Sequence, residues 1–355
     1  MPRTAAHRLP ALPSDLPEAW HGAATWTTTG EGQQSWRVRP EHLAQIMSAD
    51  MEERSRVPNG VRLEVDTDAS ALEITLTSAP APEDPVPCAD IVVDGALART
   101  VGIDGRTSAR IELPGTPVRV ELWLPHSVPT SVAEVVFDGA AQLTPAAPRG
   151  LRWAVYGSSI TQCNQAASPT GTWPALVAAE NSWELTALGM SGQCHLDPPL
   201  AETIGEARPD LVTVCLGANV YGAGTFTARS LPPTVIGFLT HVRRLVDAPI
   251  VVMSPTAAGA HREEQPNAAG LDQRDVREII HRCVRSLQQH DRMLTLIDGT
   301  EIVSTDELDL LGDLLHPTAE GYRVMAKRLA PQLAEAARGR PPRTERLPAR
   351  AGRTT

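Results

Sequence analysis

The alternation of apolar runs with helical stretches, which starts at Arg152, constrains the fold more than any other feature of the sequence. Five short apolar runs end in Gly, Ser or Pro: RWAVYG, WELTALG, DLVTVCLG, PIVVMSP and LTLIDG. The segments that favour helix are Pro174–Glu180, Pro199–Ala207, Pro233–Val246, Gln273–Gln289 and Ala319–Ala336. Apolar strands that alternate with helices form parallel sheets covered on both faces. We therefore expect an α/β domain with three layers, α/β/α, around a parallel sheet.

The chain before about Pro148 has a different texture, because apolar and polar residues alternate in short runs that end in Asp, Gly or Pro. The runs expected to form strands are Val61–Asp68, Ala71–Ser78, Ala89–Gly95, Ala109–Gly115, Val118–Pro125 and Ala133–Gly139. Short strands at this spacing, without a long amphipathic helix between them, predict an antiparallel β-sandwich or jelly roll. The expected domains are a sandwich over 1–148, an α/β domain over 149–337 and a tail over 338–355.

Charge and cysteine content limit the partners and the compartment. The 355 residues carry a formal net charge of −10, which argues against a nucleic-acid partner or an anionic membrane surface. No apolar run approaches the roughly 20 residues of a membrane span. Five scattered cysteines without close pairing favour free thiols in a reducing compartment, so a cytoplasmic location is expected. The exception in charge is the tail, whose six Arg and three Pro predict disorder or, as the alternative, docking to an anion.

Four short motifs lie just after a predicted strand or in the last loop before the final helix, at the sheet edge where open α/β folds bind ligands. In YGSSIT, Gly157 permits a sharp turn that presents a side-chain oxygen of the hydroxyl residues after it, Ser158 or Ser159. In GDLLHPTAEGY, two residues separate Asp313 from His316, so the carboxylate can reach one imidazole nitrogen while the other acts as a general base. In LGAN, Asn219 offers a neutral amide donor to a developing oxyanion. In LGMSGQ, Gly192 allows close approach of its backbone N–H.

Each motif alone has a simpler interpretation. Ser158 and Ser159 can be helix N-caps, Asp313 can cap a turn beside an exposed His316, and the Gly and Asn motifs can be plain turns. Two further histidines are also ambiguous: His195 lines an acyl pocket or is an ordinary loop residue, and His261 lies in a lid or in a polar surface loop over 259–267. The sequence holds no P-loop, no G-x-G-x-x-G after a strand and no HExxH, so no cofactor or metal is expected.

Together, and in the order Ser, Gly, Asn and Asp-x-x-His, the motifs resemble those of the SGNH/GDSL hydrolase family over roughly Arg152 to Leu333. The form YGSSITQ behind a β domain is similar to two-domain members that include carbohydrate esterases with an N-terminal jelly roll. The resemblance implies a flavodoxin-like fold, with Ser159 as nucleophile, His316 as base and Asp313 orienting the imidazole. It also implies an oxyanion hole made by the N–H groups of Ser159 and Gly192 and the Asn219 amide.

The chain departs from the family pattern at two positions. Ser158 stands where the GDS motif has Asp, and Val220 follows Asn219 where many members have Asp. Neither change removes a catalytic group, but both can alter how the neighbouring residue is held.

The expected function is a serine esterase that removes a short acyl group, acetyl above all, from a carbohydrate or small-molecule ester. The alternatives are an acyltransferase that uses the same acyl-enzyme with a sugar or natural-product acceptor, and a non-catalytic binding protein. The β domain is expected to form a wall of the site, to bind glycans or simply to cover the hydrolase domain.

Overall fold

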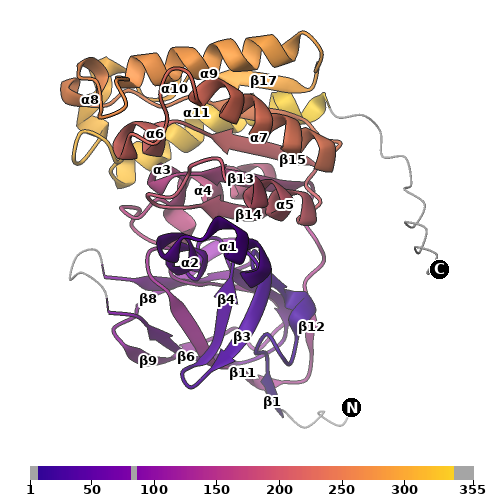
Figure 1. Cartoon of the computed structure of the whole chain (residues 1–355). Helices are drawn as coiled ribbons and strands as arrows, with labels where there is room; N and C mark the ends of the chain where they lie inside the picture. Colours follow the sequence, from indigo (N-terminus) through magenta and orange to yellow (C-terminus); the bar gives the residue numbers. More distant parts are fainter. Residues whose placement is uncertain (1–6, 81–85, 340–355) are drawn as a thin grey trace, which may run out of the picture.

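The described part of the chain contains two antiparallel sheets and one parallel sheet, together with the helices that pack around the parallel sheet (Figure 1). The computed structural model describes residues 7–80 and 86–339. Strand β12 (Leu143–Pro145) is the last of the antiparallel sheets, and β13 (Arg152–Gly157) is the first strand of the parallel sheet. The tail predicted for 338–355 lies outside the described residues from 340 onward.

The antiparallel sheets form a β-sandwich, as the alternating sequence predicts. One sheet has the order β3-β4-β11-β6-β9, with β1 also paired to β11; the other has the order β12-β5-β10-β7-β8, with β2 also paired to β5. Besides β12, the strands of these two sheets are β1 (His7–Pro10), β2 (Trp20–His21), β3 (Thr25–Thr29), β4 (Gly32–Trp36), β5 (Arg62–Thr67), β6 (Ala71–Ser78), β7 (Cys88–Val93), β8 (Ala96–Gly102), β9 (Arg106–Glu112), β10 (Val118–Trp123) and β11 (Thr130–Ala140). Inward residues such as Leu63, Val65, Leu72 and Ile74 fill the space between the sheets.

Two short helices that the sequence pattern did not predict, α1 (Pro40–Ile46) and α2 (Ala49–Ser55), connect β4 to β5. They lie between the sandwich and the α/β domain (Figure 1). Leu43 and Met51 belong to the same buried cluster as Leu188, Met190 and Leu200 of the α/β domain. The two domains therefore share a continuous apolar core at this helical pair.

The parallel sheet has the order β14-β13-β15-β16-β17, and every neighbouring pair is parallel. Its other strands are β14 (Glu184–Gly189), β15 (Leu211–Cys215), β16 (Ile250–Met253) and β17 (Leu294–Ile297). Helices α5 (Pro198–Glu206), α7 (Leu231–Leu245) and α9 (Gln273–Gln288) contribute to one core cluster, while α4 (Trp173–Asn181) and α11 (Ala319–Arg338) contribute to another on the opposite face. These five helices begin and end within two residues of the predicted limits, which confirms the three-layer fold class.

Short helices mark the loops around this sheet and the start of the sandwich: α3 (Ser159–Gln162), α6 (Ala218–Ala223), α8 (Ala260–Glu264), α10 (Gly299–Ile302), η1 (Pro17–Ala19), η2 (Pro169–Gly171) and η3 (Thr305–Leu310). All five cysteines are buried free thiols. Across the described ranges, the helices are too short or too polar to cross a membrane.

Candidate active site

Ser159 lies two residues after the end of β13, as the first residue of the single-turn helix α3. The turn is tight, since a Cβ on Gly157 would lie 2.1 Å from the Thr161 hydroxyl oxygen. Ser158 caps α3 by accepting a hydrogen bond of 3.3 Å from the Ile160 N–H. The capping interpretation therefore holds for Ser158, while Ser159 is left with a hydroxyl that points out of the helix. The first backbone N–H groups of a helix have no partner within it, so the Ser159 N–H is open to a ligand.

The loop before α11 brings His316 to this hydroxyl. The Ser159 Oγ and the His316 Nε2 are 2.8 Å apart, and the His316 Nδ1 is 2.7 Å from the Asp313 Oδ2. Because an ionised carboxylate only accepts, Nδ1 carries the proton and Nε2 accepts from the serine. The three side chains thus form an unbroken chain of hydrogen bonds across 157 residues of sequence.

Asp313 is held in place by the backbone that follows it. Its Oδ1 accepts from the N–H groups of Leu315 and His316, at 3.1 and 2.7 Å. Partial burial opposes ionisation of Asp313, but these bonds and the imidazole outweigh it, so the pKa of the carboxyl lies below its ordinary value. The carboxylate is therefore ionised at neutral pH, as an orienting acid must be.

A bridge between Leu311 and Pro317 closes the loop that carries this pair. The Gly312 N–H donates to the His316 carbonyl at 2.9 Å, and the Gly259 N–H donates to the Leu314 carbonyl at 2.8 Å. The second bond ties the Asp313–His316 loop to the segment after β16.

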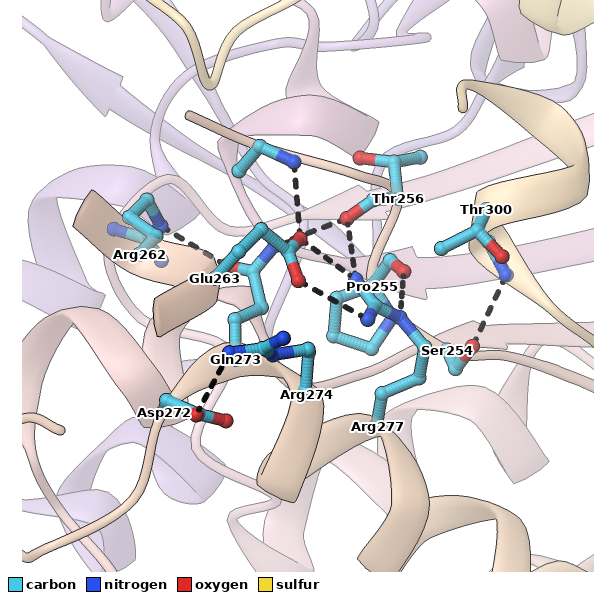
Figure 2. Close-up of polar contacts among 12 residues, drawn as sticks. Ser254, Pro255, Thr256, Arg262, Glu263, Asp272, Gln273, Arg274, Arg277 and Thr300 are labelled. Atoms are coloured by element: carbon cyan, nitrogen blue, oxygen red, sulfur yellow. Dashed lines mark hydrogen bonds and ion pairs between the residues drawn. The ribbon is translucent and has the colours of Figure 1, made fainter. Parts of the chain in front are cut away.

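That neighbouring segment is anchored by a buried polar cluster, which Figure 2 shows. Arg277 of α9 forms an ion pair of 2.9 Å with Glu263 of α8 and donates to the carbonyls of Pro255 and Thr256. Glu263 also accepts from the Ala258 N–H. These contacts hold Pro255, Thr256, Ala258 and Glu263 in place; the lid suggested for His261, in the loop 259–267, stays a prediction.

Asn219 follows β15 on α6. Gly217 enables this placement, because its φ is +105° and a Cβ there would lie 2.5 Å from Pro255 Cγ. The Asn219 Oδ1 accepts a hydrogen bond of 3.0 Å from the Cys194 N–H. With the oxygen engaged, the amide nitrogen is the end of the side chain left to donate.

Gly192 lies in the turn after β14, between Met190 and Gln193, which is closed by a bond of 2.9 Å from the Gln193 N–H to the Met190 carbonyl. Gly192 has a φ of +75° and is exposed. Its N–H has no partner within 7–80 and 86–339. The Ser191 N–H donates to the Gln162 Oε1 at 3.0 Å, so the turn 190–193 is bonded directly to the helix that begins with Ser159. The name oxyanion turn is used for 190–193 after the role proposed for it below.

His195 holds the oxyanion turn from the other side. Its Nε2 lies 3.0 Å from the Gly192 carbonyl and its Nδ1 lies 3.2 Å from the Thr225 hydroxyl. A carbonyl only accepts, so Nε2 donates to it and, in the neutral ring, Nδ1 accepts from the threonine. The sequence left open whether His195 lines an acyl pocket or is an ordinary loop residue. In the structure His195 hydrogen-bonds to the Gly192 carbonyl and so supports the turn.

The sequence did not indicate two further residues, Gln162 and Arg262, which hydrogen-bond to the loops of the candidate site. Arg262 donates to the Ala218 carbonyl at 2.7 Å, beside Asn219, and stacks on the Tyr221 ring. No sequence pattern announces such contacts, because they join residues far apart in the chain.

One cluster away from this edge has the residue types of a metal site: His21, Glu64 and Glu184. Glu64 is also paired with Arg62 and Arg119. Burial opposes its ionisation, but these arginines and Arg149 outweigh it and lower its pKa to about 2. The guanidinium groups already supply the counter-charge, so the cluster does not fit a cation.

A serine, histidine and aspartate in hydrogen-bond sequence, with Gly and Asn loops at the carboxyl edge of a five-stranded parallel sheet, define an SGNH-type domain behind a β-sandwich. Residues 155–324 match the GDSL-like lipase/acylhydrolase family, and residues 18–131 match the N-terminal domain of SsfX3. The chain therefore carries a GDSL-like lipase/acylhydrolase domain preceded by an SsfX3-like domain.

Solved structures of similar proteins extend over both domains. The salicylyl-acyltransferase SsfX3 from a tetracycline biosynthetic pathway is 26% identical with a TM-score of 0.83, covering 93% of this chain and 97% of its own. A protein from Bacteroides ovatus described as a GDSL-like lipase is 20% identical with a TM-score of 0.74, covering 94% and 98%. A family two carbohydrate esterase from Clostridium thermocellum is 14% identical with a TM-score of 0.64, covering 89% and 98%. The last two show a shared fold only. The comparison with curated protein sequences gave no significant match.

Proposed function

We propose that the chain is an acyltransferase that works through an ester on the Ser159 Oγ. The observation that carries this proposal is the contact of 2.8 Å between the Ser159 Oγ and the His316 Nε2, with Asp313 bound to the opposite ring nitrogen. As the Ser159 oxygen bonds to the acyl carbon of a donor ester, its proton passes to the His316 Nε2. The same proton then goes to the departing oxygen, and the bond between that oxygen and the acyl carbon breaks.

The negative charge that develops on the carbonyl oxygen needs donors already in place. The proposed donors are the N–H groups of Ser159 and Gly192 and the Asn219 amide. The contacts of Gln162 with Ser191 and of Cys194 with Asn219 support this assignment, because they join the three loops that carry the donors.

Release of the acyl group requires a second nucleophile. We propose a hydroxyl of a small molecule, which gives its proton to the His316 Nε2 as its oxygen bonds to the acyl carbon. The bond between that carbon and the Ser159 Oγ then breaks, and the proton returns from His316 to the Ser159 oxygen. The sequence favoured hydrolysis and held acyl transfer as the alternative. The similarity to the salicylyl-acyltransferase SsfX3 across 93% of this chain favours the alternative.

Hydrolysis is the second candidate, because the site is open to water. The side chains of Asp313 and His316 are 51% and 26% exposed. A complete Ser–His–Asp geometry argues against the third candidate, a binding protein without activity. The substrate is proposed to be an ester of a small molecule or carbohydrate, with an acyl group between acetyl and an aromatic acid in size.

The nucleophile is tested with Ser159→Ala. Wild-type protein is expected to release p-nitrophenol from p-nitrophenyl acetate or p-nitrophenyl salicylate and to gain the mass of one fluorophosphonate adduct at Ser159. The variant, with unchanged thermal unfolding, is expected to do neither. Wild-type protein that turns over neither ester and takes up no fluorophosphonate would overturn the proposed acyl-enzyme.

Transfer and hydrolysis are separated by the fate of the acyl group. The donor ester is incubated with and without a panel of sugar and phenolic acceptor alcohols, and the products are weighed by mass spectrometry. Acylated acceptor formed at the expense of free acid supports transfer. Free acid as the sole product with every acceptor supports the esterase candidate instead.

A further inference from the structure

The side chain of Arg37, from the chain just after β4 of the sandwich, is buried against the α/β domain. It is 1% exposed. Its Nη1 donates to the carbonyls of Ala187 and Gly189 at 3.1 and 2.8 Å. Its Nε and Nη2 donate at 2.6 Å to the carbonyls of Val57 and Arg54, in its own domain. One guanidinium thus joins α2 and the chain after it to the end of β14.

This arginine is bound by carbonyl oxygens instead of a carboxylate. No acidic side chain in the described ranges makes an ion pair with it. Burial, helped by the charge of Arg54, lowers the pKa of Arg37 to about 9. A buried charge without a counter-ion is costly, and here the carbonyl oxygens of both domains are what offsets that cost. The contact therefore calls for a role beyond adhesion of the domains.

Gly189, whose carbonyl accepts from Arg37, packs between β13 and α3. Gly189 pairs with Gly157 in the sheet, and a Cβ on Gly189 would lie 2.3 Å from the Gln162 nitrogen of α3. The next residue, Met190, donates its N–H to the Gly157 carbonyl at 2.7 Å and begins the oxyanion turn. Fixing Gly189 therefore sets the distance between the Ser159 helix and Gly192.

A second buried side chain from the sandwich domain binds Gln162, the residue of α3 against which Gly189 packs. Asn59, which is 1% exposed, donates through its Nδ2 to the Gln162 carbonyl at 2.8 Å. The backbones meet closely here as well, since a Cβ on Gly60 would lie 2.8 Å from the Cβ of Ala187. The sandwich thus bonds to both α3 and β14 beside the candidate site.

We propose that Arg37 is a positioning residue for catalysis: from the sandwich domain it fixes the end of β14, and thereby the oxyanion turn, relative to Ser159. Asn59 supports the same geometry from the α3 side. This inference rests on the proposed acyl-enzyme function. It gives the N-terminal domain a part in transition-state stabilisation that does not depend on binding substrate.

The chain offers a matched control in Arg62 of β5. Arg62 is also buried and also crosses between the domains, donating to the Leu185 carbonyl at 3.1 Å and pairing with Glu184 at 2.9 Å. Leu185 lies at the start of β14, whereas Gly189 lies at its end. Substitution at either arginine loosens the interface, but only Arg37 reaches the residues that lead into the oxyanion turn.

The experiment compares Arg37→Met with Arg62→Met in the full chain. Turnover of p-nitrophenyl acetate and inhibition by phenylboronic acid, which forms a tetrahedral adduct on a serine oxygen, are the readouts. Loss of one oxyanion donor costs about 10²–10³ in rate, and a displaced donor costs less. We expect Arg37→Met to lower kcat about 10–100-fold with KM within about threefold, and to raise the inhibition constant of the boronic acid in proportion. Arg62→Met is expected to keep kcat within about threefold.

Equal kcat in Arg37→Met and wild type, or equal losses in both arginine variants, would overturn the inference. If Arg37→Met does not fold, Arg37→Lys and Asn59→Ala replace it: a smaller fall in kcat, again matched by weaker boronic acid binding, is expected from each. Retention of wild-type kcat by both would refute the inference. Fluorophosphonate labelling of wild-type Ser159 is measured in parallel, because its absence refutes the acyl-enzyme itself.

Discussion

The side chain of Asn219 has two separable tasks, and substitution by aspartate divides them. In the structure its Oδ1 accepts from the Cys194 N–H at 3.0 Å, while its amide nitrogen is the proposed oxyanion donor. Asn219→Asp keeps an oxygen for Cys194 and replaces the donor by a second oxygen. Asn219→Ala removes both.

The expected losses follow from these contacts. Without the donor, kcat falls about 10²–10³-fold, or about 2.7–4 kcal/mol of transition-state stabilisation. In Asn219→Asp, repulsion between the carboxylate and the oxyanion adds to this loss. Folding should barely change in that variant, because Cys194 keeps its acceptor. Asn219→Ala leaves the N–H of a buried residue without a partner, which lowers the free energy of unfolding by about 1–3 kcal/mol.

The assay is steady-state turnover of p-nitrophenyl acetate beside urea unfolding, with both variants and wild type at the same pH. We expect a low kcat in both variants and a stability defect in the alanine variant alone. An Asn219→Asp protein that retains more than about a tenth of wild-type kcat would refute the assignment of Asn219 to the oxyanion hole.

Two further predictions concern other buried and polar contacts. Asp313→Asn keeps an acceptor for the His316 N–H but loses the charged partner of Nδ1, so kcat at neutral pH is expected to fall about 10²–10⁴-fold; a fall smaller than threefold speaks against the triad. His126 is a buried residue, with 3% of its surface exposed. Burial lowers its pKa to about 4, with Asp90 opposing the shift. The pKa of His126 in the folded protein is below the ordinary 6.5, so above pH 6.5 the neutral imidazole does not oppose folding. As the pH falls toward 4, the unfolded chain binds the proton more readily, and the free energy of unfolding decreases. Urea unfolding should show His126→Leu losing about 2 kcal/mol less than wild type between pH 7.5 and pH 5, and equal losses in both would count against this account.

Local patterns in the sequence were sufficient for six strands of the sandwich, for the five longer helices of the α/β domain and for the Asp313–His316 pair, but not for β1–β4, β8 or β12. The alternation of apolar and polar residues predicted strands such as Ala71–Ser78. The continuous apolar runs predicted β15 and β16, which lie in the buried parallel sheet. The pair is local as well, since Asp313 bonds to the N–H groups two and three residues later. Helices α1 and α2 escaped prediction because each is seven residues long and depends on packing against the other domain.

The sequence by itself determined which residue types stand at the carboxyl ends of the parallel strands, because glycine turns and polar side chains there are read directly from the chain. Only the tertiary structure decided that β14, β13 and β15 are neighbours, which brings Gly192, Ser159 and Asn219 to one edge. It also decided that Arg37 reaches Gly189, 152 residues away. The physical reason is that burial is non-directional. Its periodicity in the sequence indicates which residues are buried, but not against which strand or domain they pack.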